Sequence, residues 1–341
     1  NPHNMNAAVL VRHSDPSSSF EFRDLPLPEA GDGQVRIKVE AFGLNFADIM
    51  ARQGNYPDCP DLPAVIGYDV VGTVDAVGDG AEGILVGDRV TAMTRFGGYA
   101  EYAVTDHRAC APIGELDAGK ALALTTQYCT AWYCIHEMVN LYPGDRVLIH
   151  AAAGGVGTAL VQMARHLDLE IFGTAGSDAK LDYLRDQGVH HPINYRSTDY
   201  ENVISGIVGD TGLDTIFDPV GGDYVRKDIR MLGAGGRLVL FGASDMTGAN
   251  IFQKVRTGIG FGIYHPAQFM SASQALIGVN MLRIADHRPE VLKRCLENVV
   301  RQTQDGILDP TVAQIFPATD LAEAHAFLEG RQSMGKVGLT W

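Results

Sequence analysis

The fold is decided by one stretch of the sequence, Val147-Leu148-Ile149-His150-Ala151-Ala152-Ala153-Gly154-Gly155-Val156-Gly157. A short apolar run ends there at a glycine-rich turn, and apolar residues then recur at helical spacing from Leu160 to Leu167. A strand, a glycine turn and a helix in this order form the context in which a glycine motif predicts a dinucleotide site. Taken alone, the stretch is also compatible with an ordinary turn between a strand and a helix of a parallel sheet.

The glycine turn is a variant of the G-x-G-x-x-G pattern, with Ala152, Gly154 and Gly157 at its three positions. The second glycine of this pattern lets the backbone approach a pyrophosphate, and the third lets helix and strand pack closely. The free N–H groups at the start of the helix then face the phosphates. We therefore predict that Ala152, Gly154, Gly155, Val156 and Gly157 bind the cofactor.

The composition is that of a globular protein with an excess of acidic groups. The 341 residues are enough for two domains, and 27 Lys and Arg against 41 Asp and Glu give a net charge of −14. Nucleic acids and anionic membranes would be repelled by this charge, so neither is an expected partner. Five cysteines without a C-x-x-C pair fit a reducing compartment, and we expect a cytoplasmic protein. No apolar stretch reaches about 18 residues, so no membrane insertion is expected.

The chain changes character near its middle. Residues 5–125 hold short β segments separated by glycine and proline, which is typical of a barrel-like β domain. Later residues alternate between apolar strands and amphipathic helices, which indicates a doubly wound parallel sheet and hence an α/β fold. The predicted strands are 146–150, 171–174, 213–218 and 237–241, and the predicted helices are 158–167 and 179–187. Residues 243–275 are predicted to be a helical or loop insertion over the active site.

Four motifs carry a resemblance to a known family: Gly43-Leu44-Asn45-Phe46-Ala47-Asp48, Pro63-Ala64-Val65-Ile66-Gly67-Tyr68-Asp69, the stretch from Ala151 to Gly157, and Gly335-Lys336-Val337. With them, the chain resembles the zinc-free quinone oxidoreductase branch of the medium-chain dehydrogenase/reductase superfamily over nearly its whole length. Residues 41–54 and the segment 243–281 look most like the vesicle amine transport protein 1 homologue group within it. The resemblance implies a GroES-like β-barrel catalytic domain at 5–125 and 286–341, and a Rossmann domain that binds NADPH at 126–285.

No metal site is expected in this chain. Asn45 and Tyr68 stand where zinc-dependent relatives carry Cys and His, and neither is a usual zinc ligand. The cysteine-rich lobe that holds structural zinc in those relatives is also missing. Charge that develops on the substrate must therefore be stabilised by hydrogen-bond donors in place of a metal.

The second predicted strand favours NADPH over NADH. It ends in Gly173-Thr174-Ala175-Gly176-Ser177, without the acid that binds the ribose 2′-hydroxyl of NAD about 20 residues after the glycine motif. Ser177 and Lys180 suit a 2′-phosphate, and the resemblance places Lys180 and Tyr195 on that group. Asp178 argues in the opposite direction, and Lys180 could also be an ordinary surface residue.

Further cofactor contacts follow from place in the fold and from the resemblance. A central strand ends at the crevice, where open α/β sheets bind ligands, with Phe241, Gly242 and Ser244. The resemblance implies contacts of Thr130 with the nicotinamide, and of Arg331 and Lys336 near the phosphates. Each of these residues could equally have a structural or surface role.

The expected reaction is hydride transfer from NADPH to a quinone or an α,β-unsaturated carbonyl. Asn45, Tyr68 and Tyr56 are the predicted donors to the oxygen on which negative charge develops. Tyr56 aligns with the tyrosine of zinc-free enoyl-thioester reductases, although both tyrosines could also serve only in packing.

Two alternatives stay open. One is a 2-enoyl-thioester reductase, and the other is a non-catalytic NADPH-binding protein with a binding or transport role, as the resemblance to the vesicle protein group implies. The resemblance also implies a homodimer or a larger even assembly that pairs through edge strands of the nucleotide domain.

Overall fold

The computed structural model of the chain describes residues 3–242 and 251–341. The chain divides into two compact units, and each is described by itself. Unit 1 comprises Asn1–Cys129 and Met281–Trp341, and unit 2 comprises Thr130–Asn280.

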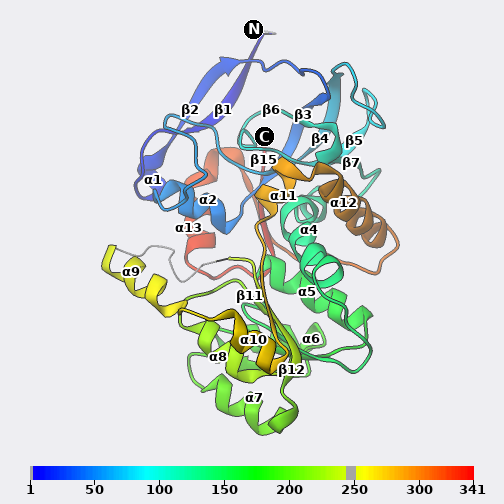
Figure 1. The fold of residues 1–341 in the computed structure, drawn as a ribbon. Coiled ribbons are helices and arrows are strands. Elements are labelled where there is room, and N and C mark those ends of the chain that lie inside the picture. The colour runs from blue at the N-terminus through cyan, green and yellow to red at the C-terminus, as the bar shows by residue number, and fades with distance from the viewer. Residues whose placement is uncertain (1–2, 243–250) are drawn as a thin grey trace. The chain divides into compact units, whose positions relative to one another are not determined.

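Unit 1 is built on a seven-stranded sheet with the order β14-β15-β3-β4-β5-β7, in which β6 also pairs with β3 (Figure 1). These strands are β3 (Gln34–Gly43), β4 (Asp69–Val77), β5 (Arg89–Met93), β6 (Tyr102–Asp106), β7 (Cys110–Pro112), β14 (Val312–Pro317) and β15 (Lys336–Thr340). A separate antiparallel pair is formed by β1 (Asn4–Leu10) and β2 (Phe20–Pro26). The last strand of the chain therefore lies inside the sheet that the first hundred residues begin.

The core of unit 1 follows the alternation of its strands. Val35, Ile37 and Val39 of β3 are buried, as expected for a strand with one face on the core. The helices of this unit are α1 (Pro16–Ser19), α2 (Phe46–Arg52), α3 (Ala118–Leu122), α11 (Met281–His287), α12 (Pro289–Gln304) and α13 (Leu321–Glu329). Helix α12 begins with proline at its first position, where a missing N–H costs nothing, and buries one apolar face.

Unit 2 is built on a parallel six-stranded sheet with the order β10-β9-β8-β11-β12-β13. Its strands are β8 (Arg146–Ile149), β9 (Glu170–Ala175), β10 (His191–Asn194), β11 (Leu213–Asp218), β12 (Leu232–Leu240) and β13 (Ala275–Gly278). Its helices include α5 (Gly155–His166), α6 (Asp178–Asp186), α7 (Tyr200–Val208), α8 (Tyr224–Met231), α9 (Ile251–Gly260) and α10 (Pro266–Ala272). Helix α5 packs on β8 and β9, and α8 packs on β11 and β12. The predicted doubly wound parallel sheet is confirmed.

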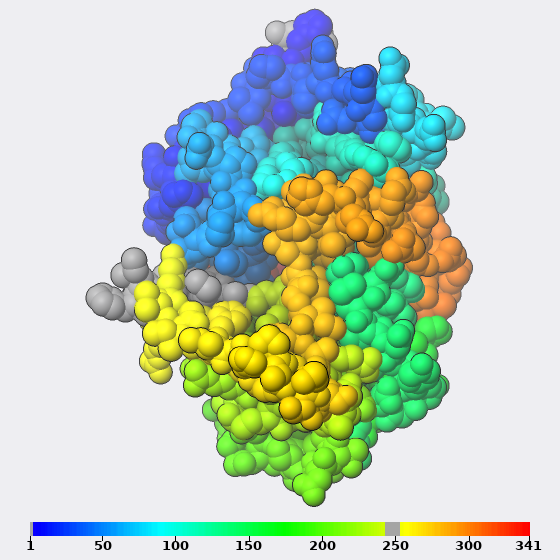
Figure 2. Space-filling view, viewed as in Figure 1, coloured from blue at the N-terminus to red at the C-terminus, as the bar shows by residue number. Residues whose placement is uncertain are grey.

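The predicted elements of unit 2 differ from the structure mainly at their ends, whereas α7, α8 and β13 are not among the predicted elements. Strand β12 begins at Leu232, five residues before the predicted start, and its glycine-rich first part pairs with β11 across a register shift. Within the predicted insertion, α9 and α10 are helical, whereas its expected position over the active site stays a prediction. Figure 2 shows these two helices on the surface of unit 2, where Val255, Ile259 and Met270 are exposed.

Candidate functional site

The glycine turn of unit 2 needs glycine at one position for packing and leaves space at another. A Cβ atom on Gly157 would lie 2.1 Å from the carbonyl oxygen of Ala151, so any side chain there would separate α5 from the turn. A Cβ atom on Gly154 would meet only that same oxygen, at 3.3 Å. Packing therefore restricts Gly154 far less than Gly157, and the missing side chain leaves the backbone accessible to a ligand.

The N-terminus of α5 is open to an anion. Gly154 is its N-cap residue and offers no side-chain cap, although the first N–H groups of a helix have no partner within it. Gly155 and Val156 are half-buried in this first turn. Ala152 is instead fully buried, and its N–H donates to Thr174 of the neighbouring strand. Ala152 thus anchors the turn on β9, while the residues after it present the N–H groups that suit a pyrophosphate.

The tip of β9 collects the groups expected for a 2′-phosphate. Ser177 caps α6, where its Oγ accepts from the N–H of Lys180 at 3.3 Å. A Cβ atom on Gly176 would lie 3.0 Å from the Tyr195 hydroxyl and 3.2 Å from Nε of Arg196. The structure therefore brings Ser177, Tyr195 and Arg196 together around Gly176, with Lys180 in the first turn of α6.

Arg196 was not predicted as a site residue. Its guanidinium lies over the Tyr195 ring, with 5.9 Å between the carbon at its centre and the ring centroid. The sequence feature that could have indicated Arg196 is its position directly after Tyr195, which was predicted to contact the 2′-phosphate. Asp178, the acidic residue that favoured NADH in the sequence, is exposed. Its Oδ1 accepts a hydrogen bond from Nδ2 of Asn194 at 3.0 Å. The carboxylate is thus engaged with the neighbouring strand end.

The structure places three of the remaining predicted cofactor residues of unit 2, Thr130, Phe241 and Gly242. Thr130 is buried in the short helix α4 (Cys129–Trp132), and the N–H of Phe241 donates to the carbonyl of Asp218 at 3.1 Å. Gly242 is exposed just beyond β12. Ser244 lies outside the described residues. Contacts of these residues with a cofactor stay predictions.

Unit 1 places two of the predicted catalytic residues in direct contact. The hydroxyl oxygens of Tyr56 and Tyr68 lie 2.7 Å apart, and the two rings meet edge to face with centroids 6.5 Å apart. Phe96 packs against both rings. Burial raises the pKa of each phenol, so both groups are protonated at neutral pH. Tyr68 is buried and Tyr56 half-buried, which makes Tyr56 the outer member of the pair.

Asn45 belongs to a buried polar cluster. Its Nδ2 donates to Oδ2 of Asp69 at 2.7 Å, and its Oδ1 accepts from Nζ of Lys336 at 3.2 Å. Asp69 also accepts from the hydroxyls of Thr125 and Thr126, at 2.5 and 2.6 Å. These bonds hold the Asn45 amide in one orientation and use one of its two N–H groups.

Lys336 does not lie where a cofactor phosphate could reach it, although the resemblance implied a place near the phosphates. It is fully buried, and its Nζ lies 2.5 Å from Oδ2 of Asp69. An ammonium group committed to a buried carboxylate is not free to bind a cofactor phosphate, so this placement corrects the prediction. Arg331 is exposed, and its guanidinium lies 5.8 Å from the Phe46 ring centroid; its contact with a phosphate stays a prediction.

A second buried network supports the helix that begins after Asn45. Asp48 of α2 accepts from the Tyr99 hydroxyl at 2.8 Å and from the Asn45 N–H at 3.2 Å. Nδ1 of His325 accepts from Nε of Arg52 at 3.2 Å, and its Nε2 lies 3.0 Å from the Tyr99 hydroxyl. Since Arg52 can only donate, His325 carries its proton on Nε2 and donates it to Tyr99. Burial lowers the pKa of His325 to about 3, which keeps the ring neutral.

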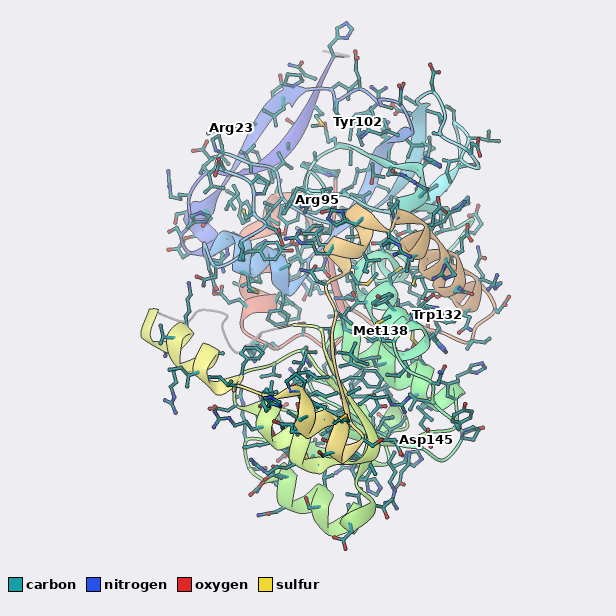
Figure 3. All side chains as sticks on the ribbon, in the orientation of Figure 1. Arg23, Arg95, Tyr102, Trp132, Met138 and Asp145 are labelled. Carbon is teal, nitrogen blue, oxygen red and sulfur yellow. The ribbon has the colours of Figure 1, made fainter. Side chains whose placement is uncertain are left out.

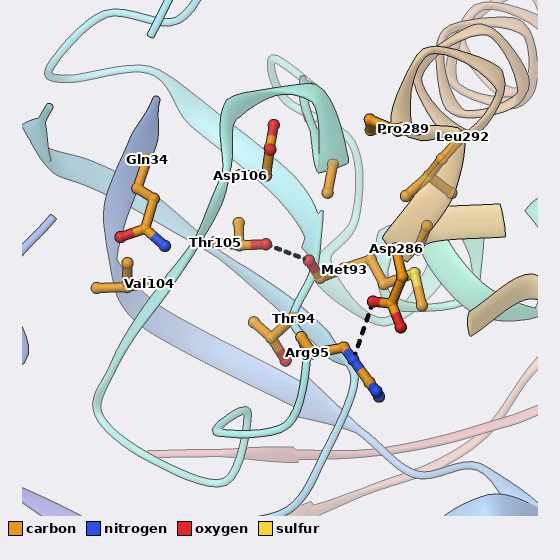
Figure 4. A pocket seen from close by; sticks show the side chains of 12 residues that line it. Gln34, Met93, Thr94, Arg95, Val104, Thr105, Asp106, Asp286, Pro289 and Leu292 are labelled. Carbon is orange, nitrogen blue, oxygen red and sulfur yellow. Dashed lines mark hydrogen bonds and ion pairs between the residues drawn. The ribbon is translucent and has the colours of Figure 1, made fainter. Parts of the chain in front are cut away.

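A cavity of about 370 Å³ lies in unit 1 between the sheet and the start of α12 (Figure 4). Arg95, on the loop between β5 and β6 (Figure 3), lines this cavity and pairs with Asp286 at 3.0 Å (Figure 4). None of Asn45, Tyr56 and Tyr68 is among the residues that line it. The cavity is therefore separate from the predicted catalytic residues.

The groups around Asn45 do not fit a zinc ion. Two donors, the Asn45 amide and the Lys336 ammonium, already converge on Oδ2 of Asp69. Zinc instead requires several deprotonated nitrogen, sulfur or carboxylate ligands. Among the described residues, one group of three potential ligands occurs, His150, Asp218 and Asp228 in the interior of unit 2.

Two family models match the chain. The alcohol dehydrogenase GroES-like domain matches residues 31–115, and the zinc-binding dehydrogenase model matches residues 155–294. The chain therefore belongs to the medium-chain dehydrogenase/reductase superfamily of oxidoreductases. The predicted α/β fold, with a GroES-like domain and a Rossmann domain, is confirmed.

Within this class the chain is similar to two kinds of protein that the sequence motifs indicated. It is 34% identical to the synaptic vesicle membrane protein VAT-1 homolog of Rattus norvegicus over 91% of this chain and 77% of that protein. It is 32% identical to the quinone oxidoreductase of Homo sapiens, over 92% of this chain and 91% of that protein. A 2-haloacrylate reductase of Burkholderia sp is 30% identical over 98% of both chains.

The fold is also that of solved structures. The Escherichia coli quinone oxidoreductase in complex with NADPH superposes with a TM-score of 0.86 and 26% identity, over 98% of this chain and 100% of that chain. A human VAT-1 homolog-like protein gives a TM-score of 0.85 and 26% identity, over 99% and 98%. No helix within residues 3–242 and 251–341 has the length and apolar character needed to cross a bilayer.

Proposed function

We propose that the chain is an NADPH-dependent reductase of quinones or α,β-unsaturated carbonyls. The hydrogen-bonded pair of Tyr56 and Tyr68 is the observation that carries this proposal. It supplies protonated donors in a place where the neighbouring groups do not suit a metal ion. The NADPH complex of the similar Escherichia coli enzyme supports the choice of cofactor.

NADPH carries a pyrophosphate and a 2′-phosphate. The glycine turn suits the pyrophosphate, and the tip of β9 suits the 2′-phosphate. The N-terminus of α5 would hold the pyrophosphate beside Gly154. Ser177, Lys180, Tyr195 and Arg196 would hold the 2′-phosphate through two hydroxyl groups and two cations. When bound, NADPH supplies a hydride for the acceptor.

The tyrosine pair stabilises the oxygen on which charge develops. Between two hydroxyl groups only one donates to the other, so the second keeps a proton for another acceptor. Because Tyr68 is the buried member, we assign it as donor to Tyr56, and the half-buried Tyr56 then donates to the substrate oxygen. The inner bond polarises the outer hydroxyl and strengthens its donation. Asn45, held by Asp69 and Lys336, would orient the substrate or the cofactor ribose with its remaining N–H.

The test is NADPH oxidation with a panel of acceptors. Steady turnover with 9,10-phenanthrenequinone, 1,4-benzoquinone or 2-chloroacrylate is the expected result. Turnover confined to crotonyl-coenzyme A would favour the enoyl-thioester reductase alternative. Tight NADPH binding without turnover on any acceptor would contradict the proposal and favour a binding or transport role.

We also propose that the chain acts in the cytoplasm as a homodimer or a larger even assembly. Strand β13 ends the sheet of unit 2, and Leu276 within it is 40% exposed. An edge strand offers unpaired N–H and C=O groups to a second copy. Light scattering that gives the mass of a monomer at micromolar concentration would contradict this assembly.

A further inference from the structure

A chain of buried polar groups runs through the interior of unit 2. The Thr174 hydroxyl lies 3.0 Å from Nδ1 of His150, and Nε2 of His150 lies 2.8 Å from Oδ1 of Asp228. Oδ1 of Asp218 accepts from the N–H groups of Val220 and Gly221, at 2.6 and 3.0 Å. The side chains of His150, Asp218 and Asp228 are completely buried. One ligand atom of each lies within 4.8 Å of the other two.

Two oxygen atoms in this series of buried polar groups have no hydrogen-bond donor. Burial lowers the pKa of His150 to about 4, so the ring is neutral. It donates from Nε2 to Asp228 and accepts from the Thr174 hydroxyl at Nδ1. Oδ2 of Asp218 and Oδ2 of Asp228 then remain, and neither has a hydrogen-bond partner among the described residues. Buried oxygen atoms without a donor are costly, and two buried carboxylates side by side are more costly still.

We propose that Asp218 and Asp228 share one proton between their Oδ2 atoms, and that this proton holds the backbone of the cofactor site in its binding geometry. The inference rests on the proposed function only in its link to NADPH. A single proton gives both orphaned oxygens a partner and removes one of two like charges from the interior. The two groups then titrate as one coupled pair.

The groups around the pair do not replace this proton. Helix α7 contributes Tyr200 and Glu201, and α8 contributes Tyr224 and Lys227, while Tyr264 follows α9. Lys227 favours ionisation of Asp228, whereas Glu201 opposes it. Burial has the largest effect and raises the pKa of both Asp218 and Asp228. One proton is therefore retained at neutral pH.

The pair connects to both turns that the cofactor needs. Asp218 ends β11 and holds the turn that follows through two N–H groups, one of them from Gly221, whose φ is +72°. His150 directly precedes Ala151, whose φ of +51° starts the glycine turn. Both turns lie at the carboxyl end of the parallel sheet, where such sheets bind nucleotides. Loss of the proton would place two repelling charges between them and displace one or both turns.

The proton can be detected without any cofactor. The infrared spectrum of the apo protein should contain the C=O stretch of a protonated carboxyl group that disappears between about pH 6 and about pH 9. Asp48 is a second buried acid with a raised pKa, so the band must be assigned by the difference between wild type and Asp228→Asn. Asp218→Asn serves the same purpose if Asp228→Asn does not fold. A wild-type protein without a band that these variants remove would overturn the proposal.

The link to the cofactor is tested by NADPH affinity. The wild-type Kd should rise roughly tenfold between about pH 7 and about pH 9, whereas the Kd of Asp228→Asn should stay constant, because its amide donates to Asp218 at every pH. Asp186→Asn removes an exposed carboxyl group of α6 and should behave as wild type does. An equal rise of the Kd in Asp228→Asn would overturn the link. If wild type bound one divalent metal ion that Asp228→Asn did not bind, a metal ion in place of the proton would join the two carboxylates, and the proposal would be overturned. Failure of wild type to bind NADPH at any pH would reject the proposed function and leave the infrared result to decide the shared proton.

Discussion

Nζ of Lys336 lies 2.5 Å from Oδ2 of Asp69, and no part of either side chain reaches solvent. Removal of one partner from a buried ion pair leaves an uncompensated charge. Lys336→Met should therefore lower the free energy of unfolding by about 3–5 kcal/mol, measured by urea denaturation. Lys120→Met is the matched control, since Lys120 pairs with Asp309 at 2.6 Å on the surface, and its effect should stay within about 1 kcal/mol. Equal losses in the two variants would contradict the role given to the buried pair.

The groups around Gly176 predict the cofactor preference. NADPH should bind at least about tenfold more tightly than NADH, a difference of about 1.4 kcal/mol. Lys180→Ala and Arg196→Ala should each reduce this preference and leave NADH affinity nearly unchanged, because only the 2′-phosphate loses a cation. Fluorescence titration of wild type and variants with NADPH and with NADH measures the two dissociation constants and hence the preference. Equal wild-type affinities would refute the assignment of this site.

The tyrosine pair predicts a loss of turnover without a loss of cofactor binding. Tyr56→Phe and Tyr68→Phe should lower the rate of acceptor reduction by roughly 10–1000-fold, with the larger effect at Tyr56, because that residue donates directly to the oxygen. Stopped-flow measurement of NADPH oxidation gives the rate. Tyr102→Phe, on strand β6, is the control for loss of a phenol elsewhere in unit 1. Unchanged rates in both variants would move the oxyanion donor to Asn45 or to a backbone N–H.

Asp48 predicts a pH-dependent contribution to stability. Burial raises its pKa to about 7, so the folded protein keeps a proton that the unfolded chain loses above about pH 4. At this group the folded state binds more protons in this interval, so the contribution of Asp48 to the free energy of unfolding falls as the pH rises from about 4 to about 7. Asp48→Asn removes this contribution. The difference in free energy of unfolding between variant and wild type should grow across that interval, and a constant difference would show that Asp48 is ionised in the folded protein.

The donors around Asp69 predict a protein without zinc. Elemental analysis of the purified protein should find no stoichiometric zinc, and chelators should leave fold and activity intact. A chelator control on a zinc-dependent alcohol dehydrogenase would verify the treatment. About one zinc ion per chain, lost together with activity, would reject the metal-free mechanism.

Local patterns predicted the parallel sheet well, because the glycine turn, β8, α5 and α6 are each specified by neighbouring residues. The buried cluster of unit 1 was harder, since Asp69 and Lys336 are separated by 267 positions. The resemblance implies a phosphate contact for Lys336, and no local pattern marks this lysine as one that is paired in the interior, where unpaired lysines are rare. The position of Arg196 beside Gly176 was not predicted, because it depends on the approach of the chain after β10 to the tip of β9. Contacts of the predicted residues with NADPH stay predictions.

The position of β15 has a consequence for how the protein is made. This strand pairs with β3 and β14, so the sheet of unit 1 cannot close until the ribosome has made residues 336–340. Unit 2, by contrast, is one continuous segment, and the six strands of its sheet are all synthesised once residue 278 has been made. While unit 2 is being synthesised, the sheet of unit 1 is therefore incomplete, and β3 is unpaired along the part of its edge that β15 later occupies. A chain that stops translation before residue 336 would contain every strand of the nucleotide domain but would leave an edge of the unit 1 sheet open, and an open edge is a site that chaperones can bind.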